Sequence, residues 1–469
     1  MIELLFLSVI TLIALSIGLY LAKGTILSVT SGYNSIWALL YYKEIILIFV
    51  PIFLLSIFPV SDFKSLKMVD QSLVFKISIY VVFSFSVYFI VYVCLLRIFF
   101  KNRKLSIAKA DLIKSFNKRK MLVFSISALV TGCFLLLFSI LFLGYDHALL
   151  TSIITGENIL HIRLHNAYHS NLPSQISYAI TFSYWITAIF SAYLFFLNRK
   201  TSSVFVFLIG MLLATAGGAK APFITYVILF VMAYLYINRP KISLFKLFFM
   251  IPLYIVFLLS LIYFIVSLQI PNLDFPRFMS YLIERFGMGQ MAGVYETFSI
   301  DFNSPQYAWH MVPFASFFVD YPIFSKELML FTEGREYAST GVKNSLFIAE
   351  AYGMGGIYLM LISPIVMAIA YLIKAYILFY SLLAFFGRIV AKVYFIPIFF
   401  LSTNLTGDFS SMVFQKGTIL LILVLGLVYL VSGFVRVFLS FRVGDGSPEK
   451  KIFKEQCNKI EARCIGLSK

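Results

Sequence analysis

Charged residues are scarce in this chain. Only 13% of its 469 residues are Asp, Glu, Lys or Arg, whereas 61% are hydrophobic, 18% are aromatic and the mean hydropathy is +0.93. A soluble domain has about 25% charged and about 45–50% apolar residues, so no soluble fold has enough polar surface to cover this chain. The same composition excludes a disordered protein, which needs many charges and few apolar residues. The sequence therefore predicts a polytopic α-helical membrane protein, and its continuous rather than alternating apolar runs exclude a membrane barrel.

Several motifs of catalysis and metal binding are also absent. The chain has no phosphate-binding Gly-x-x-x-x-Gly-Lys-Ser/Thr, no Asp-x-Asp, no His-Glu-x-x-His and no Gly-x-Ser-x-Gly, so ATP use, metal-bound nucleotide sugars, zinc proteolysis and serine hydrolysis have no support. The few cysteines fit no zinc spacing and lie in apolar runs or in the basic tail, so we expect no structural disulfide. They are Cys94, Cys133, Cys457 and Cys464. We expect no metal and no cofactor.

Long apolar runs recur along the chain, and a spanning helix needs about 20 apolar residues. The sequence predicts about eleven transmembrane helices within a membrane domain over 1–438, followed by a basic tail over 439–469. The predicted spans are roughly 1–22, 40–60, 73–97, 121–144, 176–197, 203–218, 221–237, 245–268, 352–373, 393–407 and 417–438. The two spans predicted over 203–237 could instead form one broken pair of helices or a re-entrant element. The aromatic-rich stretch 374–392 is expected along the interface.

The charge of the loops predicts which way these spans point. Segment 97–120 has nine basic residues and one acid, and the tail has seven basic residues and four acids, which places both in the cytoplasm. The net charge of +17 is concentrated in such short segments beside spans, so it does not indicate a nucleic-acid partner. Residues 145–175, the smaller outer loop, have a net charge of −1, and residues 269–349, the larger outer loop, have −3. We expect both loops outside and the C-terminus inside.

A lysine occurs at a turn expected at the outer membrane surface. Residues 216–222 read Ala-Gly-Gly-Ala-Lys-Ala-Pro, between two short predicted spans. A buried charge is energetically costly, which makes Lys220 a functional candidate. The glycines allow close backbone approach, and Pro222 suits the first turn of a helix whose N-terminus favours an anion. We expect a diphosphate site here; the alternative is a tight turn whose lysine extends to the interface.

The larger outer loop combines aromatic rings with paired charges, as binding of a sugar chain requires. Its candidate substrate-binding residues are Arg277, Arg285, Arg335, Tyr307, Trp309 and Tyr337. The alternative is an amphipathic lid anchored in the headgroups. For a general base the candidates are His310 in the same loop, and Glu350 and Asp408 at the outer ends of spans. For the two carboxylates, ion pairing is the alternative.

Three histidines of the smaller outer loop, His161, His165 and His169, share one helical face by their spacing of four. No acid completes a convincing metal site with them, so a solvated face is the favoured interpretation.

These positions resemble the Wzy-type polymerases of bacterial surface polysaccharide, also called oligosaccharide repeat-unit polymerases. Members share Gly-Gly-Arg/Lys-x-Pro between two helices, which is similar to 217–222 here, with an additional Ala219 and with Lys220 where arginine is common. A later stretch is also similar: Pro322, Thr340-Gly341, Ser345, Glu350-Ala351-Tyr352 and Gly355-Gly356.

The resemblance implies a metal-independent glycosyltransferase on the periplasmic face of a bacterial inner membrane. It would move a growing glycan from undecaprenyl diphosphate onto another lipid-linked repeat unit, forming O-antigen or capsule. The implied partners are donor and acceptor glycans, membrane lipids, and a flippase and a chain-length regulator of the same pathway. A lipid-linked oligosaccharide flippase is one alternative function, although flippases resemble two halves with short loops rather than one dominant loop. An O-antigen ligase is the other, and the sequence separates it poorly.

Overall fold

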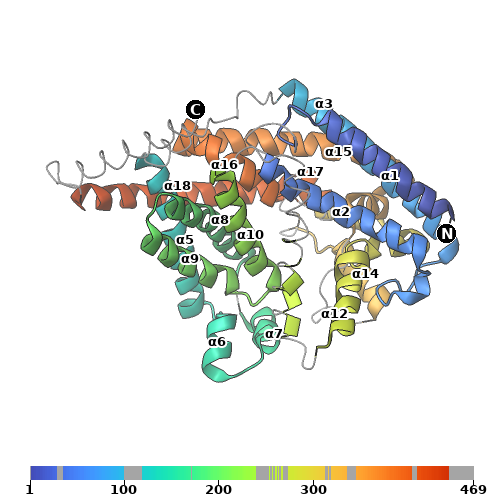
Figure 1. Ribbon diagram of the computed structural model, residues 1–469. Helices are drawn as coiled ribbons and strands as arrows, with labels where there is room; N and C mark the ends of the chain where they lie inside the picture. Colours follow the sequence, from blue (N-terminus) through green and yellow to red (C-terminus); the bar gives the residue numbers. More distant parts are fainter. Residues whose placement is uncertain are drawn as a thin grey trace.

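The computed structural model describes residues 2–28, 35–99, 119–170, 172–238, 273–311, 318–334, 345–403 and 409–442, with scattered residues over 253–267 and residue 315. Every regular element within these ranges is a helix, which confirms the predicted all-α fold (Figure 1). The first half contains α1 (Ile2–Leu21), α2 (Ser35–Ile57), η1 (Val60–Asp62), η2 (Gln71–Leu73), α3 (Val74–Phe99), α5 (Arg119–Phe142), α6 (Ala148–Thr155), α7 (Ile159–His169), α8 (Ser174–Phe196), α9 (Lys200–Thr215) and α10 (Lys220–Asn238). The second half contains α12 (Phe275–Leu282), η4 (Ile283–Met288), α13 (Ala292–Ser299), η5 (Pro305–Met311), α14 (Phe324–Glu333), α15 (Phe347–Phe386), α16 (Arg388–Leu401), α17 (Phe409–Val413) and α18 (Lys416–Arg442).

The described helices identify a membrane protein but do not reach the predicted number of spans. Five of them are long and apolar enough to cross a bilayer, and α2 makes six if its two parts, bent by 51°, are one span. The bend follows from Pro51, whose ring clashes with the carbonyl four residues earlier. Three further apolar helices, in α1, α9 and α10, are shorter. The predicted span over 245–268 lies mostly outside the described residues, so the prediction of about eleven spans is not confirmed.

The transmembrane helices form two packed groups. In one, α8 lies among α5, α9 and α10, and in the other α15 packs along α3, α16 and α18 (Figure 1). Small polar residues bring α8 and α9 together. The Ser191 hydroxyl donates to the Ser203 carbonyl at 2.9 Å, and the Ser203 hydroxyl donates to the Ser191 carbonyl at 2.8 Å. Close approach of small residues is the usual way in which membrane helices associate, because lipid provides no hydrophobic force between them.

Helix α15 is broken near its outer end. Gly356 has φ +64° and ψ −158°, a conformation essentially confined to glycine, and Gly355 is also non-helical. Residues 347–354 therefore form a separate helical segment before the long span. Beyond 373 the helix continues to Phe386, and its buried side chains recur every four residues at Lys374, Leu378, Leu382 and Phe386. The prediction that 374–392 lies along the membrane interface is therefore wrong for residues 374–386, because this buried stripe packs inside the bundle.

Hydrogen bonds join segments that lie far apart in the sequence. The connection between α2 and α3 bonds to the larger outer loop, since the Lys64 N–H donates to Glu284 at 2.8 Å. The Arg119 guanidinium donates to the Arg436 carbonyl at 3.1 Å, joining α5 to α18. Both bonds link the first half of the chain to the second.

Candidate functional site

The Gly-Gly turn between α9 and α10 packs against the smaller outer loop. The Ala148 N–H donates to the Ala216 carbonyl at 2.9 Å. Gly218 has φ +65°, and a Cβ there would lie 2.7 Å from the Ala148 Cβ and 3.0 Å from the Arg163 Cγ. A side chain at Gly218 would be strained and would overlap its neighbours. Glycine is therefore required for contact with the loop itself.

Arg163 of α7 is the cation that the structure places beside this turn. Its side chain is exposed, and its methylene stem lies against Gly218. Lys220 is the first residue of α10, whose N-terminal amides face the same turn; the lysine side chain lies outside the described residues. Arginine binds phosphate oxygens with two parallel N–H bonds, and a helix N-terminus favours an anion. The turn thus combines a guanidinium with a helix N-terminus, as a phosphate site requires.

His147 connects the smaller outer loop to α9. Its Nδ1 accepts the Leu150 N–H at 3.3 Å, which caps α6, and its Nε2 lies 3.0 Å from the Leu212 carbonyl. Both bonds are satisfied only by a neutral ring protonated on Nε2. Burial lowers the pKa of His147 below its ordinary 6.5, although the Leu212 carbonyl opposes this.

A second polar group surrounds Asp146. The Asn166 side chain accepts the Asp146 N–H at 2.9 Å and donates to the Asp146 carbonyl at 2.7 Å. The Asp146 carboxylate lies 3.3 Å from the His165 Nδ1. Tyr145 directly precedes Asp146 in the chain. Burial raises the pKa of Tyr145 to about 12, and the nearby Arg163 partly opposes this rise. These contacts fix α7, and with it Arg163, over the Gly-Gly turn.

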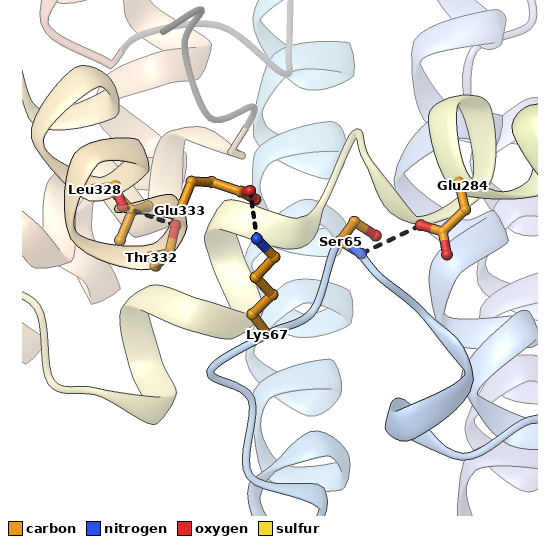
Figure 2. Close-up of polar contacts among 6 residues, drawn as sticks. All are labelled: Ser65, Lys67, Glu284, Leu328, Thr332 and Glu333. Carbon is orange, nitrogen blue, oxygen red and sulfur yellow. Dashed lines mark hydrogen bonds and ion pairs between the residues drawn. The ribbon is translucent and has the colours of Figure 1, made fainter. Parts of the chain in front are cut away.

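The larger outer loop is fixed to the connection between α2 and α3. Besides Lys64, Ser65 donates its N–H to the Glu284 carboxylate at 3.3 Å, and the Lys67 ammonium lies 2.8 Å from Glu333 (Figure 2). Glu284 and Glu333 lie on η4 and α14, so this connection holds two parts of the loop. Glu284 accepts its hydrogen bonds from backbone amides, whereas the neighbouring Arg285, a predicted substrate-binding residue, is exposed.

Helix α12 brings part of the larger outer loop next to α10. Phe278 belongs to a small apolar cluster against which Ile224, one turn after Lys220, packs. Asp274 caps α12 by accepting the Arg277 N–H at 2.8 Å, and its carboxylate lies 3.7 Å from the Arg277 guanidinium. Arg277, a predicted substrate-binding residue, is exposed and lies next to Asp274, which caps its own helix. Arg335, another predicted substrate-binding residue, lies outside the described residues.

Helix α13 of the larger outer loop enters the bundle. Tyr295 is fully buried, and its hydroxyl lies 3.0 Å from the Ser78 hydroxyl of α3. The next residue, Glu296, is also fully buried. The Phe298 ring packs on Tyr352 of α15 with centroids 4.6 Å apart. Sequence reasoning did not single out Glu296; the available signal was a lone acid in the small, apolar run 291–298. The loop is thus partly a buried element and not only a lid.

Glu350 lies below this loop at the outer end of α15. It is 3% exposed, and Ser410 donates its N–H at 3.2 Å and its hydroxyl at 3.0 Å to the two carboxylate oxygens. Glu350 therefore caps the first turn of α17 from another helix. Element η5, which carries His310, packs on both α15 and α17. The structure thus packs the element that carries His310 on the two helices that Glu350 joins, while the His310 side chain and Asp408 lie outside the described residues.

The expected aromatic platform is divided between core and surface. Tyr307 is 7% exposed and its ring lies between Phe302, with centroids 5.7 Å apart, and Phe324, at 5.4 Å. This packing leaves the Tyr307 ring little free face for a sugar. Trp309 is 48% exposed and remains able to stack, and Tyr337 lies outside the described residues. The Tyr352 hydroxyl donates to Asp301, which ties the outer segment of α15 to the loop.

A lysine buried inside the span was also missed. Lys374 of α15 is 3% exposed, and its ammonium donates to the Ser402 carbonyl at the end of α16. A cation at a helix C-terminus complements the helix dipole. Glu350 at the start of α17 and Lys374 at the end of α16 thus bind opposite ends of an interrupted helix pair. The sequence signal was a single charge inside an apolar run, which is costly in a membrane.

The described residues contain no group of three or more His, Cys, Asp or Glu side chains that could hold a metal ion. No family model matches the chain, and no curated protein or solved structure matches it either.

Proposed function

We propose that this membrane protein polymerises undecaprenyl-diphosphate-linked oligosaccharide repeat units, as Wzy-type polymerases of O-antigen or capsule do. The observation that carries the proposal is Glu350, a carboxylate buried at the outer end of α15 and held by two hydrogen bonds from Ser410. A carboxylate oriented in this way is suited to accept a proton from a sugar hydroxyl. Arg163 beside the N-terminus of α10 supports the same reaction, because it is suited to bind a diphosphate.

In the proposed reaction, an acceptor hydroxyl oxygen attacks the anomeric carbon of the donor glycan. The bond from that carbon to the diphosphate oxygen breaks, the diphosphate leaves with the bonding electrons, and Glu350 takes the hydroxyl proton. Arg163 and Lys220 stabilise the charge that develops on the leaving group. His310 on η5 and Asp408 before α17 are the alternative bases. The scheme uses no ATP, because the donor glycan is already activated.

The same proposal assigns the protein to a bacterial inner membrane, with the outer loops in the periplasm and the C-terminus in the cytoplasm. The excess of basic residues in 97–120 and in the tail supports this orientation. A periplasm-active reporter should be silent when fused after Leu439 and active when fused within 300–320. The reverse pattern would place the site on the wrong side for this substrate.

Glycan length in a deletion strain tests the function itself. A polymerase deletion should leave surface glycan of a single repeat unit. Absence of surface glycan would instead indicate the flippase, and long chains retained on the carrier lipid would indicate the ligase.

Complementation of that strain tests the proposed base. Glu350→Gln keeps the shape of the side chain and one oxygen that accepts from the Ser410 N–H, while its amide can donate to the Ser410 hydroxyl, but it removes the basic carboxylate. We expect about a hundredfold or greater loss of polymerisation, the usual contribution of a general base. Glu157→Gln, at an exposed acid of the smaller outer loop, is the matched control and should retain long chains. Purified protein should remain active with EDTA; rescue by magnesium would contradict the metal-independent scheme.

A further inference from the structure

A cavity of about 240 Å³ lies between α5, α15, α16 and α18, at the end of the molecule opposite the outer loops. Its lining includes Lys120, Phe385, Phe386, Gly387, Tyr429 and Arg436. Two of these residues are cations from different helices, and none of the described residues that line the cavity is a carboxylate. The cavity is therefore positively charged on one side and aromatic on the other.

A helix N-terminus lies at this cavity. Helix α16 begins at Arg388 directly after Gly387, which has φ +84°. A Cβ at Gly387 would lie 3.8 Å from the Lys120 Nζ, so the ammonium faces the start of α16. The first amides of a helix have no partner within the helix and attract anions. Two side-chain cations and the start of α16 thus point to a single negatively charged group.

The aromatic wall identifies the rest of the ligand. Phe385, Phe386 and Tyr429 pack together, with centroids of Phe385 and Tyr429 5.5 Å apart and those of Phe386 and Tyr429 5.9 Å apart. Rings of this kind lie at the level of lipid headgroups, where one end of the ligand is apolar and the other is wet. A soluble inorganic anion has no apolar part that could contact these rings, whereas the glycerol and acyl groups of a phospholipid would contact them.

The chain itself offers no matching occupant. The segments that flank the cavity in sequence, 97–118 and 443–469, carry an excess of Lys and Arg over Asp and Glu. Like charges repel a cationic cavity, so these segments do not complement it.

We infer that this cavity binds the phosphate of an anionic glycerophospholipid from the adjacent leaflet. Lys120 and Arg436 bind the phosphate together with the start of α16, and the rings contact the glycerol backbone. Basic cavities between transmembrane helices are the recognised type of site for acidic headgroups. The bound lipid would join α5, α16 and α18, an assignment that is independent of the glycosyl transfer proposed at the other end.

Native mass spectrometry of the purified full chain tests the assignment, with phosphatidylglycerol as the probe and phosphatidylcholine as the neutral comparison. The double variant Lys120→Gln/Arg436→Gln should bind phosphatidylglycerol about thirtyfold more weakly, since two cations near an anionic membrane surface together contribute ~2 kcal/mol. The matched control Lys23→Gln/Lys200→Gln removes two exposed lysines outside the cavity and should bind as the native chain does.

Three outcomes would overturn the inference. They are equal weakening by both double variants, equal retention of phosphatidylcholine and phosphatidylglycerol by the native chain, and displacement of phosphatidylglycerol by millimolar inorganic phosphate, which would indicate a general anion site. If the cavity variant fails to fold, the lipid comparison and the phosphate competition on the native chain still decide the matter.

Discussion

The two outer loops are attached to the transmembrane helices in opposite ways. The smaller loop is held against α9 and α10 by the bond from Ala148 to the Ala216 carbonyl, the bond from His147 to the Leu212 carbonyl and the close approach permitted by Gly218. The larger loop inserts α13 into the bundle, where Tyr295 and Glu296 are fully buried. A position fixed by a few contacts is sensitive to single substitutions, whereas a position fixed by burial is insensitive to changes at its surface.

The same difference separates the two kinds of chemistry at the outer end. The smaller loop presents an exposed cation, Arg163. Glu350, at the start of α15, is a buried carboxylate whose hydrogen bonds to Ser410 fix its orientation. In the reaction proposed above, the exposed cation of the smaller loop would recognise the charged leaving group, and the buried carboxylate would accept the proton. The predictions below test this division, beginning with the largest expected effect.

Substitution of Gly218, in the turn that packs against the smaller loop, should destabilise this region more than substitution of Gly144, which directly precedes that loop. Gly218→Ala combines a left-handed backbone, which costs about 1–2 kcal/mol, with overlap of the Ala148 and Arg163 side chains, which costs about 1–3 kcal/mol more. Gly144→Ala is the matched control, because Gly144 has φ +63° but no atom within 4 Å of the added Cβ. Thermal unfolding in detergent measures both. Equal destabilisation would show that Gly218 matters only through its backbone conformation.

Arg163→Ala should reduce polymerisation about tenfold to a hundredfold, the value of one charged hydrogen bond made in the transition state. Arg163→Lys should retain part of the activity, and Lys220→Ala should show a comparable loss, with Lys220→Arg retaining part. Arg277→Ala provides the comparison with the larger loop, where Arg277 is exposed and lies next to Asp274. A larger loss from Arg277→Ala than from Arg163→Ala would move diphosphate recognition to the larger loop. Rates of chain extension by purified variants decide between the two.

The composition was sufficient to predict the helical class, and most span boundaries agree with the helices to within a few residues. For 121–144 the helix is Arg119–Phe142, and for 176–197 it is Ser174–Phe196. Hydropathy succeeds here because every backbone polar group in a bilayer must be satisfied within its own segment. The hydropathy criterion failed at 374–386 because the buried stripe there includes Lys374. A lysine lowers the hydropathy of a segment even when, as here, its ammonium donates to the carbonyl at the end of another helix.

The candidate site was predicted less well, because its residues are brought together by contacts that no local pattern encodes. Sequence reasoning singled out the Gly-Gly turn, as a diphosphate site or a tight turn, and Glu350, but neither interpretation included contact between the turn and the smaller loop. The docking of Ala148 on Ala216 links residues about seventy positions apart, and it places Arg163 at the turn. Likewise, the lone acid in the apolar run 291–298 marks Glu296 as unusual but does not show whether the run lies on the membrane surface or inside the bundle, so the burial of Glu296 was missed.

The stability of the smaller loop should depend on pH through His147. Its pKa in the folded protein lies below the ordinary 6.5, so between these values the unfolded chain binds more protons. Stability is therefore complete above about pH 6.5 and declines as the pH falls towards the lower pKa of the folded state. Unfolding temperatures across this range should show a slope that His147→Asn removes, because asparagine also caps helices but does not titrate. An unchanged slope in that variant would assign the effect to the other histidines.

The smallest effect is expected at the surface of the larger loop. The Lys67 ammonium lies 2.8 Å from Glu333, but the lysine side chain is 47% exposed, so water screens the pair. Exposed ion pairs contribute about 0–1 kcal/mol, and Lys67→Gln should therefore change the unfolding temperature little and leave glycan length unaffected. If burial of α13 holds the loop, loss of this pair leaves Glu350 covered and oriented as before. A marked fall in the stability of Lys67→Gln at low salt that disappears at high salt would show instead that surface charges hold the larger loop. The two loops would then differ only in degree.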